Sequence, residues 1–390
     1  MSLRDPMRQP AALDLSGIPA VDGHCHPLVA ASEEVSRERF LDLFSEGRAG
    51  TMRAHVAQTG YLKRALRGLA DGLGCAPTVE AVLERRRAGG PEAARRRFAG
   101  SGITALLVDT GYPVVGAMPL AEMRRALPCA VHEVFRIETC AQGLIAHGLP
   151  YEEFLGAFRA ALSAAAAHAV ALKSIIAYRS GLAVRTWEAA DAARAYRDVV
   201  ARIKAGGSAR LTEKPLLDTL FEIALGVCRE SGRPLQVHSG FGDPDVDLLQ
   251  SNPLWLRPIL EDERWADVRI VVLHMSYPYA REAAFMAAVW PQVYVDLSLA
   301  LPFLGPAAAL PLVEMLALAP ASKLMYGSDV SALPELFALS AAWGRAALGE
   351  ALAWIVERGG LAEEEAREAG ALVLSGSATA LYGLARPSRV

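Results

Sequence analysis

Eight short apolar runs, rich in β-branched residues, recur along the chain between polar or glycine-bearing turns and longer helical patterns. They lie at 18–27, 103–111, 130–139, 169–178, 233–240, 268–276, 292–298 and 323–330. Because the runs are continuously apolar instead of alternating, they predict strands that are covered on both faces. Strands that alternate with helices indicate βαβ units in a parallel sheet. The pattern therefore predicts an α/β protein.

The number of runs narrows the architecture, because eight parallel strands close a (β/α)8 barrel, the TIM barrel. The alternative is an open, doubly wound sheet, but no G-x-G-x-x-G follows the first run to support it. Residues 28–102 separate the first two runs and carry helical patterns around 34–47, 52–72 and 78–99. We therefore expect a helical insertion after strand 1, at about 31–100, lying at the barrel mouth as lids do.

The chain has 390 residues, a length that suggests two or three domains, but a single barrel can also hold a chain of this length. The strand count favours a single (β/α)8 domain at 18–385, preceded by an N-terminal extension at 1–17. The uncharged run at 297–313 contains several prolines and is shorter than a membrane span needs. We expect it to be a loop that leads into a helix.

Composition excludes several classes of protein. The chain is 52% hydrophobic with a formal net charge of −3, which argues against disorder and against nucleic acid or an anionic membrane as the main partner. Its five cysteines are scattered and form no C-x-x-C pair, so neither a disulfide framework nor a cysteine zinc site is indicated. The N-terminus lacks the apolar core of a signal peptide. We expect a cytoplasmic protein that acts on a small molecule and pairs as a homodimer.

Titratable residues lie where four of the predicted strands end. These runs finish in His24-Cys25-His26, His238, His274 and Asp329. The active site of such a barrel lies at the carboxyl ends of its strands, and residues i and i+2 of a strand point to the same face. Neutral imidazoles with a carboxylate suit Zn²⁺ best, with Mn²⁺ or Fe²⁺ as alternatives. The sequence therefore predicts a metal site, with Cys25 pointing away from it.

Lys173 lies at the carboxyl end of the fourth run, where a bare ammonium would be costly after an apolar strand. It is one of only five lysines among 40 basic residues. This scarcity argues against a replaceable surface charge and favours a role for Lys173 in the site.

The motifs VDGHCHP (21–27) and GSD (327–329), with the single histidines that end strands five and six, resemble the amidohydrolase superfamily of metal-dependent hydrolases. The resemblance covers about 18–385. Two further segments, VFRIET (134–139) and ALKSIIAYRSGL (171–182), are similar to the branch found alone or fused to glutamine-synthetase-like domains. Substrate does not transfer with either likeness.

The resemblance implies that His24, His26 and Asp329 hold a first metal ion, which His238 joins in the one-metal version. In the two-metal version a carboxylated Lys173 bridges the ions. The second ion is then held by His238 and His274. As a free ammonium, Lys173 would instead bind a substrate carboxylate or polarise a carbonyl group.

A bound Zn²⁺ lowers the pKa of its water from about 15.7 to about 7, which makes hydroxide available at neutral pH. Asp329 is placed to accept the proton and to pass it to the leaving group. The metal, with His274 if that residue is not a ligand, would stabilise the oxyanion. Arg136, and Arg179 with Tyr178 beside it, are candidates for binding a substrate carboxylate. A structural salt bridge is the alternative for the Tyr-Arg pair.

Glu138, on the third predicted strand, could be a ligand, as a carboxylate there is in some relatives. We favour the alternative that it forms an ion pair with Arg136 or Arg179.

The function expected from these residues is hydrolysis of an amide, lactone or similar bond in a small acidic molecule. Two alternatives stay open: a metal-dependent decarboxylase, lyase or isomerase on the same barrel, and a binding module without turnover. The catalytic candidates are Asp329, His274 and Lys173.

Overall fold

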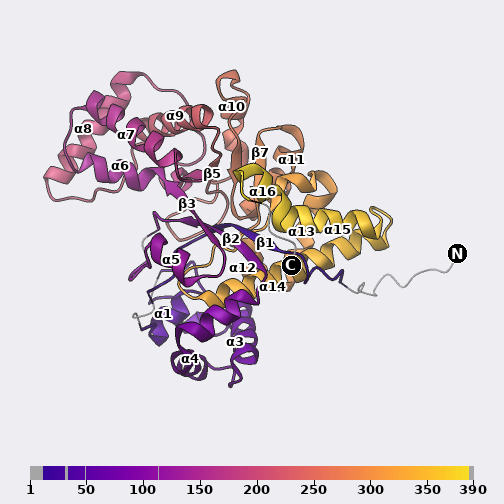
Figure 1. The fold of residues 1–390 in the computed structure, drawn as a ribbon. Coiled ribbons are helices and arrows are strands. Elements are labelled where there is room, and N and C mark those ends of the chain that lie inside the picture. Colours follow the sequence, from indigo (N-terminus) through magenta and orange to yellow (C-terminus); the bar gives the residue numbers. More distant parts are fainter. Residues whose placement is uncertain (1–11, 31–33, 49, 113, 386–390) are drawn as a thin grey trace.

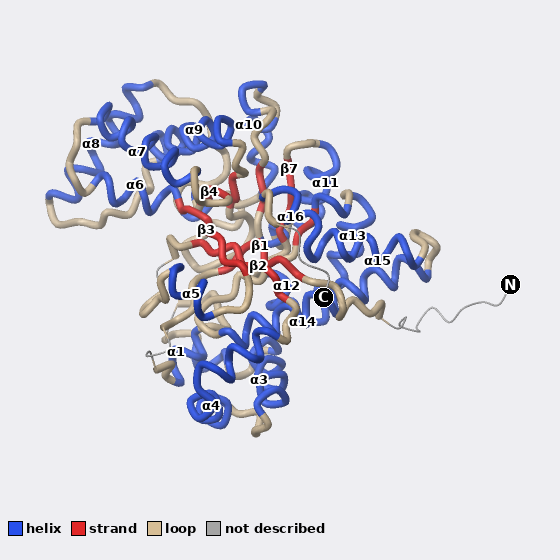
Figure 2. The backbone as a smooth tube through the Cα atoms, viewed as in Figure 1, coloured by secondary structure: helices blue, strands red, loops and turns tan. Residues whose placement is uncertain are grey.

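The computed structural model describes residues 12–30, 34–48, 50–112 and 114–385. Its centre is one eight-stranded parallel sheet whose strands follow each other in chain order, and Figure 2 shows them in red with the helices around them. The strands are β1 (Ala20–Cys25), β2 (Ile103–Asp109), β3 (Ala130–Arg136), β4 (Ala171–Ser174), β5 (Leu235–Val237), β6 (Ile270–Val272), β7 (Val293–Asp296) and β8 (Leu324–Met325). Each lies within its predicted run, so the predicted (β/α)8 barrel is confirmed.

Backbone hydrogen bonds between β1 and the chain after β8 close the sheet. Gly23 N–H donates to the Tyr326 carbonyl at 3.0 Å, and Asp329 N–H donates to the His24 carbonyl at 2.8 Å. Since an open sheet would leave these groups on unpaired edge strands, this pairing excludes the doubly wound alternative. It also brings the first and last site residues in the sequence side by side.

The insertion after β1 is helical, as predicted. It contains α1 (Arg37–Asp42), α2 (Arg53–Val56), α3 (Gly60–Leu73) and α4 (Val79–Ala99). Thr59 caps the first turn of α3, and α4 bends at Gly90, which has a positive φ of 64° and precedes Pro91. The labels of α1, α3 and α4 lie together on one side of the barrel in Figure 1, and α3 and α4 pack against α14 (Pro334–Glu357).

Most of the remaining helices surround the barrel (Figure 1), and several short helical turns lie between them and the strands. They are α5 (Leu120–Ala126), α6 (Ile137–Ile145), α7 (Tyr151–Ala166), η1 (Ile176–Tyr178), α8 (Ala189–Lys204), α9 (Lys214–Ser231), η2 (Pro253–Leu256), α10 (Arg257–Leu260), η3 (Glu263–Trp265), η4 (His274–Ser276), α11 (Ala280–Val289), α12 (Ala300–Leu304), η5 (Gly305–Ala308), α13 (Ala309–Leu318), η6 (Ala321–Lys323), α15 (Glu363–Ala371), η7 (Leu372–Gly376) and α16 (Ser377–Tyr382).

The run at 297–313 is more helical than predicted, because α12, η5 and the start of α13 replace the expected loop. By length and composition alone, Ala300–Leu318 is apolar enough to cross a membrane. In this fold the same stretch packs α12 and α13 against α14, and α13 also packs against α11. These contacts cover part of the stretch, of which 33% is buried.

One end of the barrel is closed by α16. Ala378, Leu381 and Tyr382 belong to a buried apolar cluster with strand residues that include Val21 and Ala171. Arg269, immediately before β6, donates a hydrogen bond to the carbonyl of Leu381, which places α16 at the amino ends of the strands. The opposite, carboxyl ends of the strands are where the active sites of such barrels lie.

Candidate metal centre

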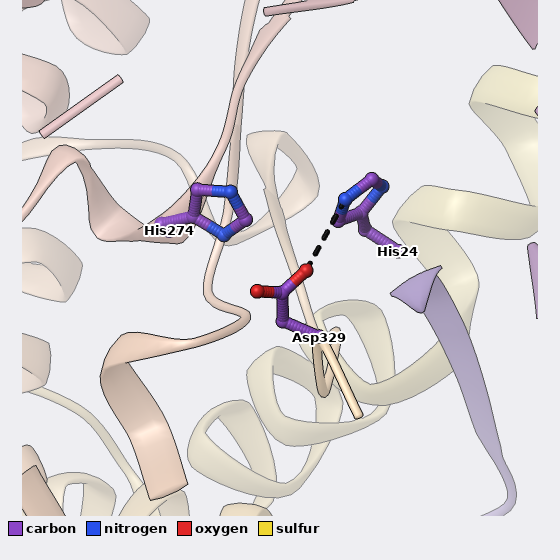
Figure 3. A group of neighbouring side chains, drawn as sticks. All are labelled: His24, His274 and Asp329. Carbon is purple, nitrogen blue, oxygen red and sulfur yellow. Dashed lines mark ion pairs between the residues drawn. The ribbon is translucent and has the colours of Figure 1, made fainter. Parts of the chain in front are cut away.

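His24, His274 and Asp329 converge at the carboxyl ends of the strands, and Figure 3 shows the three side chains facing one another. Each offers one ligand atom, and these atoms all lie within 4.8 Å of one another. Oδ1 of Asp329 lies 3.3 Å from Nε2 of His24 and 3.0 Å from Nε2 of His26. Neither contact has hydrogen-bond geometry, so Oδ1 of Asp329 is a buried acceptor without a hydrogen bond from the described residues.

The backbone turns sharply at two of these residues. His274 has a φ of 66° and Asp329 a φ of 58°, in the left-handed region that side chains rarely adopt. Such conformations cost on the order of 1–3 kcal/mol and persist where the surrounding structure imposes them. His274 follows the end of β6 at Val272 and Asp329 follows the end of β8 at Met325, and both side chains face the cluster.

Gln236, from β5, fixes the tautomer of His24. Its Nε2 donates both protons, to the Gly23 carbonyl at 2.9 Å and to the Tyr382 hydroxyl at 2.8 Å. Its Oε1 therefore faces Nδ1 of His24, at 2.8 Å, as an acceptor. Because Nδ1 must then carry the proton, Nε2 of His24 presents a lone pair to the site.

Ser298 has the same effect on His274. Its hydroxyl donates to Oδ1 of Asp296, so Oγ accepts from Nδ1 of His274 at 2.9 Å. Nε2 of His274 is thereby left unprotonated. Hydrogen bonds that orient ligand imidazoles in this way are typical of metal sites.

The charge state of the cluster also suits a cation. Burial, with the nearby charge of Lys173, lowers the pKa of His24 to about 4. Burial likewise lowers the pKa of His274 far below its usual range. Burial acts in the opposite sense on Asp329, but the imidazoles of His274, His26 and His24 hold the pKa of this carboxyl well below its usual range. Neutral imidazoles and an ionised carboxylate are the forms that bind a metal.

His238 and His26 lie at the edge of this group. Nε2 of His238 is buried without a partner among the described residues, and its ring centroid is 4.5 Å from that of His274 and 4.1 Å from that of Tyr178. His26 stacks on Tyr112 with centroids 4.4 Å apart. Both residues line the site cavity but lie outside the mutual cluster of His24, His274 and Asp329.

Lys173 is buried among the predicted ligands, as its position in the sequence indicated. Its Nζ lies 3.1 Å from Nε2 of His24, and its side chain is 1% exposed. Burial lowers the pKa of Lys173 to about 8, although the carboxylate of Asp109 favours the ammonium. The neutral amine, which is the form that carboxylation needs, is therefore more populated at neutral pH than in a surface lysine.

Arg136 does not have the partner that we predicted from the sequence. Its guanidinium binds Asp109, at the end of β2, with Nη2 2.5 Å from Oδ2, and both residues are buried. This pair holds the pKa of Asp109 far below its usual range against the effect of burial. Arg136 lines the cavity, but its charge is already compensated by Asp109.

The predictions for Glu138 were wrong in two respects. Glu138 lies in the first turn of α6, not on the third strand, and it forms no ion pair with Arg136 or Arg179 in the described structure. Its Oε1 accepts hydrogen bonds from the Ser174 hydroxyl at 2.6 Å and from Ile175 N–H at 3.0 Å. Glu138 thus ties α6 to the end of β4, and it does not line the site cavity.

The site opens into a cavity of about 580 Å³, a size typical of small-molecule sites. Arg179 lines it with its Nε buried and unpartnered, and the guanidinium makes no ion pair with a described residue. The salt-bridge alternative for the Tyr-Arg pair is therefore wrong. The neighbouring Arg210 is paired with Asp245 at 2.6 Å.

Several site residues were missed in the sequence. Asp109 and Gln236 are polar residues in apolar runs, a signal that could have identified them. Glu46 and Asp243 line the cavity from the insertion and from the segment after β5, where no strand pattern marks them. Cys25 is buried and donates to the Leu107 carbonyl, as its predicted packing behind the strand requires.

The histidines and the aspartate lie at the carboxyl ends of the barrel strands, where the active sites of this fold lie. The amidohydrolase family model matches residues 206–384 of this chain, which include His238, His274 and Asp329. The structure also resembles a "putative metal-dependent hydrolase" from Lactobacillus casei ATCC 334, with a TM-score of 0.85, 27% identity, and 96% and 98% of the two chains covered. The resemblance to the amidohydrolase superfamily is confirmed.

More distant structures share the fold alone. The uronate isomerase of Thermotoga maritima has a TM-score of 0.65 at 14% identity, with 94% of this chain and 95% of the other covered. The glucuronate isomerase of Caulobacter crescentus has a TM-score of 0.63 at 15% identity, with 96% and 93% covered.

A sequence relative with 29% identity over 401 residues is protein fluG of Emericella nidulans. The alignment covers 94% of this chain but 46% of the relative. The chain therefore spans about half the length of this relative.

Proposed function

We propose that this protein is a metal-dependent hydrolase that activates water for attack on an amide, lactone or similar carbonyl group of a small, carboxylate-bearing substrate. The observation that carries the proposal is the convergence of His24, His274 and Asp329, with both imidazoles held in the tautomer that presents Nε2 to a shared centre. The likeness to the Lactobacillus casei protein, at 27% identity, supports it.

The residues that would hold a cation are His24, His26, His238, His274 and Asp329. A divalent cation in such a site acts as a Lewis acid that polarises a carbonyl group and makes water more acidic. We propose Zn²⁺, with Mn²⁺ or Fe²⁺ as alternatives, because the donors are imidazole nitrogens and a carboxylate. Whether one or two ions bind depends on the state of Lys173.

Asp329 would take the proton of the attacking water at its carboxylate and return it to the leaving group. Its low pKa keeps the carboxylate ionised at neutral pH. As an ammonium, Lys173 could donate a hydrogen bond to the oxygen that becomes negative, and as a carbamate it would be an anionic ligand.

Arg179 would bind the substrate carboxylate. An unpaired, half-buried guanidinium is electrostatically costly, and a planar carboxylate satisfies two of its donors at once. Arg136 and Arg210 also line the cavity, but each already binds an aspartate.

The proposal is tested by measuring metal content and hydrolysis in parallel. We expect the isolated protein to contain a divalent metal, to lose hydrolysis of a panel of acidic amides and lactones on chelation, and to regain it with Zn²⁺, Mn²⁺ or Fe²⁺. His24→Ala should lose both metal and activity, whereas His147→Ala, at an exposed position outside the cavity, should retain both.

Three outcomes would contradict the proposal. Full activity of His24→Ala would exclude both metal-dependent functions, the hydrolase and the decarboxylase, lyase or isomerase. Release of CO₂ from aromatic or unsaturated acids, without hydrolysis, would instead indicate a metal-dependent decarboxylase. A protein without bound metal or turnover would indicate a binding module. The expectations of a homodimer, of a cytoplasmic location and of no nucleic-acid or membrane partner stay predictions.

A further inference from the structure

The exposed apolar side chains of this protein are concentrated on one part of its surface. Of the thirteen large apolar side chains that are exposed in the described structure, eight belong to three segments: 248–256, α11 and α13. α11 packs against α13 (Figure 1) and also against η2, which belongs to the first segment. The three segments therefore adjoin one another, and we call their exposed surface the α11–α13 face.

The outer sides of α11 and α13 each carry an apolar stripe. On α11, Phe285 and Val289 are four residues apart and are 42% and 52% exposed. On α13, Leu310 and Leu318 are eight residues apart and are 72% and 51% exposed. Residues with these spacings lie on the same side of a helix. Each helix therefore presents one row of large apolar groups to solvent.

An ion pair joins the two stripes. Arg281, four residues before Phe285, binds Glu314 through two hydrogen bonds of 2.8 and 2.6 Å. Glu314 lies midway between Leu310 and Leu318 along α13. Because both charged residues belong to the stripes by their spacing, their contact places the two stripes side by side. The two charges compensate each other, so the stripes together carry no net charge.

The loop segment extends the face past the start of α11. The hydroxyl of Tyr279, the residue before α11, donates to the Leu248 carbonyl at 3.0 Å. Leu249 is 75% exposed and Trp255 is 48% exposed, and Leu248 and Leu254 are exposed as well. The indole N–H of Trp255 already donates to the Leu249 carbonyl at 3.0 Å. The exposed part of this side chain is therefore an apolar ring whose polar atom has a partner.

The α11–α13 face has the extent of a protein interface. Aromatic side chains have about 150–250 Å² of surface each and aliphatic ones somewhat less, so eight that are roughly half exposed present on the order of 700 Å². The largest apolar patch on a typical monomer is about 300–600 Å². Each partner of a standard interface buries about 800 Å². The face therefore exceeds an ordinary monomer patch and approaches the area that a stable dimer needs.

The charges of the face favour a second copy of the chain as its partner. The charged residues of the three segments are Arg281, Glu314 and Glu282, and the first two bind each other. An anionic membrane is attracted by unpaired cations, which these segments lack. A strongly charged protein would likewise meet no complementary charge. A nearly neutral apolar face can contact its own copy without strong like-charge repulsion, as the self-complementary interface of a two-fold dimer requires.

We infer that the protein forms a two-fold homodimer in which the α11–α13 face of one protomer packs on the same face of its partner. Phe285, Leu310, Leu249 and Trp255 become buried in this interface. None of the eight exposed residues lines the site cavity, so dimer formation and the proposed hydrolysis are separable in experiments.

Sedimentation velocity of the full chain over a range of concentrations tests the dimer. We expect the wild type to dimerise with a dissociation constant of about 10 μM or lower. Leu249→Arg and Leu310→Arg should each raise this constant at least about tenfold, because an arginine in an apolar interface loses its hydration. The matched control is Val115→Arg, at a position that is 78% exposed and follows β2, across the barrel from β6. It should dimerise as the wild type does.

Folding and metal content are measured in the same samples. Since all three substituted side chains are exposed, the circular dichroism spectra and the metal content of the variants should match those of the wild type. If the dimer forms as expected but hydrolysis is absent, the proposed function fails and the interface stands.

A wild type that sediments as a single chain up to about 100 μM would overturn the inference, since that corresponds to a binding free energy too small for a stable dimer. A dimer that neither Leu249→Arg nor Leu310→Arg weakens would also overturn it, because the interface would then lie elsewhere. A monomeric wild type that binds phosphatidylcholine vesicles, with binding lost in Leu310→Arg, would assign the face to a membrane instead.

Discussion

Oε1 of Gln236 lies 2.8 Å from Nδ1 of His24, and both residues are fully buried. The contact joins the first and fifth strands across the barrel interior. Because both amide protons of Gln236 are used elsewhere, the oxygen is an acceptor, and the lone pair of His24 Nε2 is directed to the site. The metal affinity of the site should therefore depend on a residue that does not itself bind the ion.

Replacing Gln236 by methionine keeps the length of the side chain but removes the acceptor. We expect the dissociation constant of the metal to rise about 10- to 100-fold, since loss of an orienting partner has effects of this size. Competition with a chromogenic chelator measures it. The matched control is Gln292→Met, a buried glutamine that donates to the Leu260 carbonyl away from the site. If Gln236→Met bound the metal as tightly as the wild type, Gln236 would not orient His24 for metal binding.

Tyr382 supports the same amide from α16, near the end of the described chain. Tyr382→Phe should weaken metal binding less than Gln236→Met, by about threefold to tenfold, because the Gly23 carbonyl still holds one amide proton. The same chelator competition measures it. Tyr196→Phe, whose hydroxyl donates to Leu149 outside the site, should have no effect on the metal. An effect of Tyr382→Phe as large as that of Gln236→Met would mean that Gly23 does not orient the amide.

The Asp109–Arg136 pair makes a prediction about stability. Asp109→Asn leaves a buried guanidinium without its counter-ion, so we expect the free energy of unfolding to fall by about 3–5 kcal/mol. The double variant Asp109→Asn/Arg136→Met removes both charges and should recover part of that loss. Urea denaturation measures both. A double variant that is less stable than Asp109→Asn would contradict this prediction, because Arg136 would then stabilise the fold without its counter-ion.

Gly240 lies where the segment that follows His238 packs against the backbone of the segment that follows His274. It has a φ of 73°, and a Cβ there would lie 2.4 Å from the Ser276 carbonyl carbon and from the Tyr277 oxygen. Because both are backbone atoms, Gly240→Ala should displace the segment of His238 from that of His274. We expect the free energy of unfolding to fall by about 1–3 kcal/mol and the affinity for the metal to decrease. The control Gly143→Ala, with open space in α6, should be neutral or slightly stabilising.

Glu46 should give stability a distinct pH dependence. Its pKa is raised from 4.5 to about 8 by burial and by the carboxylates of Asp329 and Asp243. The folded state therefore binds this proton more tightly than the unfolded state, and the associated stability is full below about pH 4.5 and is lost as pH rises to about 8. The stability of the wild type relative to Glu46→Gln should fall over this range without ligand. Urea denaturation at a series of pH values measures this difference. The same pH dependence of the free energy of unfolding in both proteins would contradict the shift.

Much of the fold could be predicted because strand periodicity is local. Continuous apolar runs identified all eight strands, and the long segment between the first two identified the helical insertion. The boundaries were less accurate where a helix starts directly after a strand: α6 begins at Ile137, right after β3 ends at Arg136, so Glu138 lies in the first turn of the helix. The prolines of the run at 297–313 predicted a loop that leads into a helix, but in the structure Pro302 and Pro306 lie in the first turns of α12 and η5, where proline is tolerated.

The sequence by itself determined which chemistry is present and at which strand ends, since the parallel barrel brings His24, Lys173, His274 and Asp329 to one edge. Only the tertiary structure decided how their charges are balanced. Arg136 binds Asp109, Arg179 is left unpaired, and Glu46 reaches the cavity from an insertion with no strand pattern. Ion pairing depends on which side chains meet within about 4 Å in space, and local periodicity does not encode distances between residues far apart in the chain.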